Sequence, residues 1–248
     1  MSEALTRLRW LLCFEGNTSA SSAFVVPMLV RIAADTRQHS RVQALQLVGD
    51  LARVHIFRME TRGLMLQTMG STPVYDASGY TENWAVDAVR MMVGRDAGPL
   101  IELLHDNDPQ VRGRAIYALV TALPVDSNLL ELMRHRLTVE EDAAVRLTLV
   151  VGIAQHFWEL DQVPEALDWS REIWSNPGSS AGLRLGGAIA WLNLTDQEAA
   201  PELRRVLDQL PLPLVRELSL QLPWISWLSY PADGIDLWWQ QLTDVEGR

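Results

Sequence analysis

The sequence predicts an all-α protein, and three observations support this prediction. Apolar residues recur at helical spacing, for example within residues 25–32, where they fall on one helical face. No stretch shows a convincing alternation of polar and apolar residues bounded by turns, which would indicate a half-buried strand. Several segments also place an aliphatic–arginine pair ahead of a helical apolar pattern, and these arginines are Arg112, Arg146, Arg184 and Arg216. Their separations of 34, 38 and 32 residues match the period of stacked two-helix units.

The expected elements follow in order from this repeat. An earlier copy of the pattern spans residues 21–54, with Arg41 in the matching place, 71 residues before Arg112. Each later arginine segment is preceded by an amphipathic run, so the unit is expected to be a helix, a short turn and a second helix. The first helices are expected at residues 84–104, 128–137, 163–174 and 198–210. The second helices are expected at residues 106–123, 140–155, 179–194 and 212–228.

Two segments stand outside this unit. Only one more first helix fits between Arg41 and Arg112, so residues 55–80 are interpreted as an irregular insertion rich in Gly, Met, Ser and Thr. Long irregular segments of this kind are usually functional or mobile. Thr81 is expected to cap the helix that follows, because its hydroxyl can accept from amides of the first turn. A C-terminal capping helix is expected at about residues 232–244, since a terminal unit must cover its open apolar face.

The repeated motif resembles that of the HEAT-repeat family. It reads Asp-Pro-Gln-Val-Arg-Gly-Arg-Ala over residues 108–115 and Asp-Ala-Ala-Val-Arg over residues 142–146. The chain is also similar to HEAT-repeat proteins of actinobacteria, whose preference for arginine over lysine it shares. The resemblance covers roughly residues 20–228 and implies one right-handed α-solenoid domain over residues 1–248, with about five to six helical pairs. It also implies a ladder of aspartate–arginine pairs between neighbouring repeats.

The composition excludes several classes of function. All 21 basic residues are arginine, so there is no lysine for a Walker-type phosphate loop, a pyridoxal aldimine or another Schiff base. The net charge of −10 argues against a duplex-binding surface, so nucleic acid is an unlikely partner. Cys13 is the only cysteine, the first ten residues lack a secretion-signal pattern, and no stretch is apolar enough to span a membrane. A cytoplasmic protein without a membrane partner is therefore expected.

No residue pattern indicates a cofactor, a metal or a catalytic centre. The five histidines show no zinc-ligand spacing and no H-E-x-x-H motif. There is also no G-x-S-x-G elbow around a candidate nucleophile. No metal or other cofactor is therefore predicted, and catalytic residues stay unknown.

Two features leave alternatives open. Eight of the ten tryptophans lie within residues 158–239, where they either fill the core or form an aromatic wall. Trp191 aligns with a core leucine, whereas Trp224, Trp227, Trp238 and Trp239 are better candidates for a surface or cap. The glycines at 182, 186 and 187 lie inside an expected helix, where they allow either close helix packing or a cavity.

Alignment of the second helices on their arginines predicts a binding surface. Positions two, five and nine residues after each arginine alternate with the aligned apolar positions that must pack in the core. They are therefore expected to line the concave face of the solenoid. The predicted binding residues are Arg114, Tyr117, Thr121, Thr148, Val151, Gln155, Ile189 and Asn193. Tyr75, Asp76 and Tyr80 of the insertion are expected at the rim.

The expected function is that of a non-enzymatic scaffold that uses this concave face to bind a protein partner. Because the chain is acidic, a basic partner such as a toxin or a regulatory protein is favoured. The alternative is a HEAT-like pocket enzyme acting on an aromatic or hydrophobic small molecule, with a DNA glycosylase as a weaker version. A small hydrophobic ligand therefore stays possible beside a protein partner.

Overall fold

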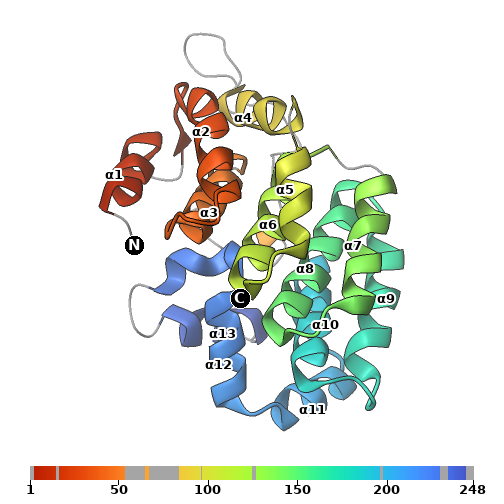
Figure 1. Cartoon of the computed structure of the whole chain (residues 1–248). Coiled ribbons are helices and arrows are strands. Elements are labelled where there is room, and N and C mark those ends of the chain that lie inside the picture. The colour runs from red at the N-terminus through yellow and green to blue at the C-terminus, as the bar shows by residue number, and fades with distance from the viewer. Residues whose placement is uncertain are drawn as a thin grey trace. The chain divides into compact units, whose positions relative to one another are not determined.

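The computed structural model describes residues 3–14, 17–53, 65–66, 84–95, 97–124, 127–195, 198–229 and 234–243. These residues are almost entirely helical, which confirms the predicted all-α class (Figure 1). The exception is a short antiparallel pairing of β1 (Cys13–Phe14) with β2 (Asn17–Thr18), in which Cys13 lies opposite Thr18. No helix in the described part of the chain is long and apolar enough to cross a membrane.

The chain divides into two compact units. Unit 1 comprises residues 1–58 and 67–126, and unit 2 comprises residues 59–66 and 127–248. Each unit is described by itself below. The single solenoid domain expected from the repeat stays a prediction.

Unit 1 is built around a contact between α3 and α6. In chain order its helices are α1 (Glu3–Leu12), α2 (Ser22–Ala34), α3 (Arg41–Leu51), α4 (Trp84–Arg95), α5 (Gly98–Glu102), η2 (Leu103–His105) and α6 (Pro109–Ala122). Helix α2 packs on both α3 and α4, and α1 contacts α3. The expected single helix over residues 84–104 is broken between α4 and α5, where Gly98 and Pro99 begin a new helical turn.

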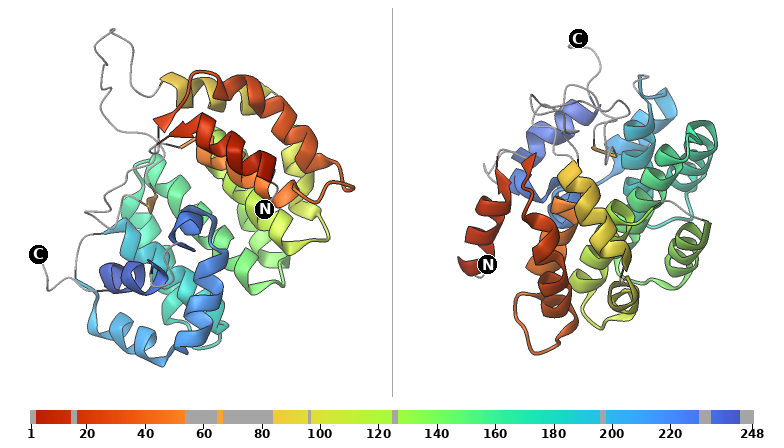
Figure 2. Two further views of the ribbon diagram at one scale, coloured as in Figure 1. Left: turned by 90° about the vertical axis from the view of Figure 1, so that its left-hand side faces the viewer. Right: turned by 90° about the horizontal axis from the view of Figure 1, so that it is seen from above.

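Unit 2 is built around α10. Its helices are α7 (Ser127–Val139), α8 (Ala143–Glu159), α9 (Val163–Ser175), α10 (Ala181–Leu194), α11 (Pro201–Gln209), α12 (Leu212–Gln221), η3 (Pro223–Ser229) and α13 (Gly234–Thr243). Helix α7 packs on α8, and α8 and α9 both pack on α10 (Figures 1 and 2). Helix α10 contacts α8 and α9, and also α11, α12 and α13. The expected helix over residues 212–228 is split by Pro223, and the expected C-terminal helix is present as α13.

The aspartates of the repeated motif begin helices. Asp108 accepts a hydrogen bond from the backbone N–H of Gln110 at the start of α6. Asp142 accepts from the N–H groups of Ala144 and Val145 at the start of α8. Both are N-caps, which satisfy amides that have no partner inside the helix. The predicted pairing of these aspartates with arginines in a ladder is therefore wrong, because their carboxylates bind the backbone of their own helices.

The glycines of α10 serve close helix packing. A Cβ at Gly187 would lie 2.8 Å from Ile173 Cγ2 and 2.9 Å from the backbone nitrogen of Trp174. A Cβ at Gly186 would lie 3.3 Å from Leu147 Cα. Both glycines are buried, so α10 approaches α9 and α8 closely because these positions carry no side chain. Of the two explanations open at the sequence level, the structure favours close packing.

The turn between α8 and α9 places a non-glycine residue in the left-handed region. Asp161 has a φ of 57°, and the N–H of Gln162 bonds to Phe157 O at 2.9 Å while the N–H of Asp161 bonds to Trp158 O at 3.1 Å. These two bonds are those of a Schellman motif, in which the left-handed position is usually glycine.

Asp161→Gly is expected to raise the free energy of unfolding by about 0.5 to 1 kcal/mol, because glycine adopts this conformation without a Cβ penalty. Chemical denaturation measures the change. Asp161→Ala is the control, because it removes the same carboxylate but keeps the Cβ, and it is expected to be less stable than the glycine variant. Equal stability of the two variants would contradict this account of the turn.

Candidate functional site

The predicted concave residues do not form an exposed surface. Tyr117, Thr121, Val151, Gln155 and Ile189 are fully buried, and Thr148 and Asn193 are 1% exposed. Arg114 is half-buried in α6. The expectation of an open binding face at these positions is therefore wrong. The predicted rim residues Tyr75, Asp76 and Tyr80 lie outside the described residues.

Packing against further helices explains this burial. In an open solenoid the second helix of each pair would keep one free face. Here α10 is contacted by α12 and α13 in addition to α8 and α9, and its residues 185–194 are all buried. Trp224 in η3 is likewise buried, and its indole N–H donates to Gln155 Oε1 of α8 at 2.7 Å. The face predicted to bind a partner is thus part of the core of its own unit.

Three polar residues of this face bond to carbonyls of their own helices, although the amide oxygen of Asn193 is buried without a hydrogen-bond partner among the described residues. Thr121 Oγ1 donates to Tyr117 O at 2.6 Å, and Thr148 Oγ1 donates to Ala144 O at 2.8 Å. Asn193 Nδ2 donates to Ile189 O, also at 2.8 Å. A hydroxyl or amide that bonds to the carbonyl four residues earlier can be buried at little cost. Polarity alone therefore did not indicate exposure at these positions.

One sequence signal pointed to this burial. After Arg146 no charged residue follows in α8 until Glu159, and after Arg184 none follows in α10. A helix without charges on any face is typical of a fully buried helix.

A buried carboxylate, Asp50, organises the centre of unit 1. It is 2% exposed and accepts hydrogen bonds from Gln46 Nε2 at 2.8 Å and from the Tyr117 hydroxyl at 3.1 Å. Arg9 of α1 lies 3.1 Å from its second oxygen. Burial, reinforced by the negative charge of Asp50, raises the pKa of the Tyr117 phenol well above its usual range. Tyr117 therefore acts as a neutral donor that joins α6 to α3, and not as an exposed anchor for a partner.

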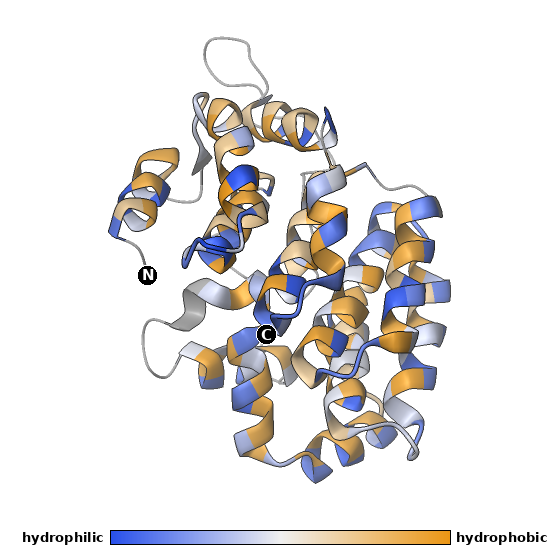
Figure 3. Ribbon diagram, viewed as in Figure 1, coloured by the Kyte–Doolittle hydropathy of each residue, from blue (hydrophilic) through white to orange (hydrophobic). Residues whose placement is uncertain are grey.

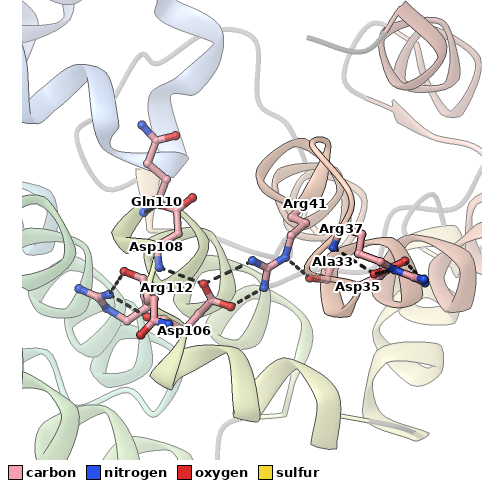
Figure 4. Close-up of polar contacts among 9 residues, drawn as sticks. Ala33, Asp35, Arg37, Arg41, Asp106, Asp108, Gln110 and Arg112 are labelled. Carbon is pink, nitrogen blue, oxygen red and sulfur yellow. Dashed lines mark hydrogen bonds and ion pairs between the residues drawn. The ribbon is translucent and has the colours of Figure 1, made fainter.

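Three of the five repeated arginines bind the carboxyl ends of the preceding helices. Arg41 Nε donates to Ala33 O of α2 at 2.8 Å, and Arg184 Nε donates to Trp174 O of α9 at 3.2 Å. Arg112 Nη1 donates to Asp106 O, directly after η2, at 2.8 Å (Figure 4). A cation at this position satisfies carbonyls that have no intrahelical donor. These contacts give the arginines a structural role. Their main partners are backbone carbonyls within one pair of helices, and not aspartates of a neighbouring repeat.

Two of the arginines also form ion pairs with a later element. The Arg41 guanidinium binds the Asp106 carboxylate, which follows η2 (Figure 4). Arg216 of α12 binds Asp236 of α13 through two bonds of 2.8 and 2.6 Å. Arg146 makes no hydrogen bond or ion pair with any described side chain. A continuous ladder is therefore absent from the part of the chain that the structure describes.

The pair of Arg41 and Asp106 predicts a pH dependence of stability. Burial alone would raise the pKa of Asp106, but hydrogen bonds from Arg41 and from the N–H of Asp108 outweigh it and hold the pKa below its usual value. A lowered pKa stabilises the folded state above the unfolded value of about 3.9, and this contribution is lost as the pH falls further.

Asp106→Asn is therefore expected to lower the Tm at neutral pH, and the Tm difference from the wild type is expected to shrink below about pH 4. Thermal unfolding followed by circular dichroism at several pH values measures this difference in Tm. A difference that stayed constant on acidification would contradict the proposed role of this carboxylate.

The tryptophans mostly fill the core. Trp174, Trp191, Trp224 and Trp238 are between 1% and 4% exposed, and Trp239 is half-buried. The core interpretation of Trp191 is confirmed. For Trp224 and Trp238 the surface alternative is wrong, because η3 and α13 turn these rings inward, whereas the alternative of a cap stays a prediction. The side chain of Trp227 lies outside the described residues.

Unit 2 carries an acidic surface on α9. Residues 127–248 hold 18 acidic and 9 basic residues, whereas residues 1–126 hold 13 and 12, so most of the negative charge is in the second half. Glu165, Asp168 and Glu172 are all exposed and lie at spacings of three and four residues within α9. Residues at these spacings share one side of a helix. These three residues are named the α9 acidic face, and none of them forms an ion pair with a described residue.

An aromatic ring lies beside these carboxylates. Trp169 is half-buried, four residues after Glu165 and three before Glu172, so it belongs to the same side of α9. Its ring packs against Phe157 with a centroid distance of 5.9 Å. The guanidinium of Arg134 lies 5.2 Å from the centroid of Phe157, a cation–π contact. This surface was not predicted from the arginine-aligned positions, because those positions all belong to the second helices, whereas α9 is the first helix of its pair.

Metal binding is not indicated by the geometry of the described residues. Among them, no group of three or more His, Cys, Asp or Glu side chains comes together in a way that could hold a metal ion. Compared with known protein families, curated proteins and solved structures, the chain has no match.

Proposed function

We propose that the protein is a non-enzymatic binding scaffold, an α-solenoid of HEAT-like helical pairs, that binds a basic segment of a protein partner. The α9 acidic face is the observation that carries this proposal. The polar residues first expected to meet the partner are buried and bond to their own helices, so they support packing. The binding surface is accordingly placed on the outer side of unit 2.

The charges of α9 favour a cationic partner. Acidic residues three and four positions apart repel one another by about 0.2 to 0.5 kcal/mol per pair. Arg171 is the only basic residue of α9, and it makes no ion pair with the acidic face. A partner with several guanidinium or ammonium groups at matching spacing would relieve this repulsion and gain electrostatic attraction.

Trp169 adds a contact that selects for cations. A guanidinium placed over an indole ring gains about 0.5 to 1 kcal/mol at an exposed site. The protein already holds one guanidinium, that of Arg134, against the adjoining Phe157. An arginine of the partner that reaches Trp169 would therefore be flanked by Glu165, Asp168 and Glu172.

The test uses an arginine-rich peptide as the probe and isothermal titration calorimetry at low and moderate salt. The combined variant Glu165→Gln, Asp168→Asn and Glu172→Gln is expected to weaken binding about tenfold, equal to about 1.4 kcal/mol. Trp169→Leu is expected to weaken it about two- to fivefold. Binding to the wild type is expected to weaken as salt rises, because the contacts are exposed to solvent.

A matched control removes the same charge elsewhere. Glu131, Asp208 and Glu217 are exposed on α7, α11 and α12, and Glu131→Gln, Asp208→Asn and Glu217→Gln together repeat the chemistry of the first variant. Binding by this control is expected to stay within about threefold of the wild type. An equal loss in both combined variants would show that net charge, and not the α9 acidic face, attracts the peptide, and would overturn the proposal.

A further inference from the structure

Helix α2 of unit 1 is apolar on its exposed side as well as on its buried side. Val26, Leu29 and Ala33 face the core, yet Phe24 is 84% exposed and Met28 is 41% exposed. Arg31 is the only charged residue of the helix, and the visible side of α2 is mainly hydrophobic in colour (Figure 3). Helices that are apolar all round are normally covered on all sides.

A groove runs along the same helix. It has a volume of about 170 Å³ and is lined by Pro27, Val30, Arg31 and Ala34 of α2, by Met92 of α4 and by Pro99 of α5. A cavity of about 150 Å³ in an engineered protein core holds benzene, so this groove is large enough for one phenyl ring. Phe24, an exposed phenyl ring, and the groove thus lie on one helix, with their centres about 10 Å apart along its axis.

We propose that this surface joins two copies of the chain through antiparallel α2 helices related by a two-fold axis beside Pro27 and Met28. In this arrangement Phe24 of each copy enters the groove of the other and meets Arg31 of the other copy. A two-fold interface must be complementary to itself, and α2 carries both the inserted ring and the groove that receives it. The contact of Phe24 with the guanidinium of the other copy is a cation–π pair.

The local charge supports a second copy as the occupant. The exposed positions of α2, namely residues 24, 27, 28, 31 and 34, contain no carboxylate, although the chain has a net charge of −10. The nearest acidic residue after the helix, Asp35, is held by Arg37 through bonds of 2.9 and 3.0 Å. Two acidic chains can therefore approach one another on this face without opposing carboxylates.

Sedimentation velocity over a wide range of concentration tests the proposal. The wild type is expected to show a reversible monomer–dimer equilibrium. Phe24→Arg places a cation opposite Arg31 of the other copy, so the dimer Kd is expected to rise at least about tenfold. Phe24 is exposed, so this substitution leaves the core of unit 1 unchanged. Leu11→Arg is the matched control, because Leu11 is 76% exposed on α1, and the dimer is expected to persist.

A charge reversal tests the antiparallel register. The double variant Phe24→Arg, Arg31→Glu places the introduced guanidinium of one copy opposite the introduced carboxylate of the other. It is therefore expected to restore the dimer that Phe24→Arg alone disrupts. A wild type that stays monomeric at every concentration, or a dimer that survives Phe24→Arg, would overturn the proposal. A dimer that is lost in the single variant and not restored in the double variant would overturn the antiparallel arrangement.

Discussion

Asp50→Ala is expected to destabilise the protein by about 3 to 5 kcal/mol, one of the largest losses that a single substitution can cause here. The carboxylate is buried, accepts from Gln46 and Tyr117, and faces the guanidinium of Arg9. Its removal leaves a buried phenol and a buried amide without their acceptor, and leaves positive charge uncompensated. Urea denaturation followed by tryptophan fluorescence measures the loss.

Two control variants separate the buried network from a general effect of charge. Asp50→Asn keeps an oxygen acceptor at nearly the same place, so it is expected to lose less stability than the alanine variant. Asp208→Ala removes an exposed carboxylate and is expected to stay within about 0.5 kcal/mol of the wild type. A loss at Asp50 no larger than that at Asp208 would contradict the organising role of this residue in unit 1.

Gly187→Ala is expected to destabilise unit 2 by about 1 to 3 kcal/mol, although alanine is the better helix former. The added Cβ would lie 2.9 Å from the backbone nitrogen of Trp174, which cannot move without shifting α9. The control is Gly94→Ala in α4, where a Cβ would have no atom within 4 Å. The free energy of unfolding of that variant is expected to rise by about 0.5 to 1 kcal/mol, because alanine causes no clash there and has a higher helix propensity than glycine.

The two glycine-to-alanine variants are informative together, because they are expected to change the free energy of unfolding in opposite directions. Thermal unfolding of both variants, measured under the same conditions, compares the same substitution at a buried, tightly packed position and at an exposed one. A stabilised Gly187→Ala would show that α9 and α10 have room between them, and would reopen the cavity explanation for the glycines of α10.

Helix positions could be predicted from the sequence because they depend on local signals. The predicted helix over residues 163–174 is observed as α9 (Val163–Ser175), and the predicted segment over residues 179–194 contains α10 (Ala181–Leu194). Prolines and glycines account for the errors, since they break the predicted helices before Pro99 and at Pro223. The apolar periodicity of the sequence continues through such breaks, whereas the helical backbone conformation ends at them.

Exposure could not be predicted in the same way. The alignment on the arginines placed Tyr117, Val151 and Ile189 at equivalent positions, but it could not show which face other helices would cover. Burial of α10 depends on α12 and α13, which are about 20 to 50 residues away in the sequence. Hydroxyl residues such as Thr121 bond to a carbonyl of their own helix, so their polarity does not mark the surface.

The bonds from Arg41, Arg112 and Arg184 to the carbonyls that end the preceding helices have a consequence for how such a chain can grow in evolution. Each bond joins the two helices of one pair, and donor and acceptor lie within ten residues of each other in the sequence. A gene segment that encodes one pair therefore encodes both the arginine and the carbonyl of the bond that joins its two helices. Duplication or loss of such a segment leaves these backbone bonds of the remaining pairs complete, whereas the ion pair of Arg41 with Asp106, which joins two successive pairs, needs both segments.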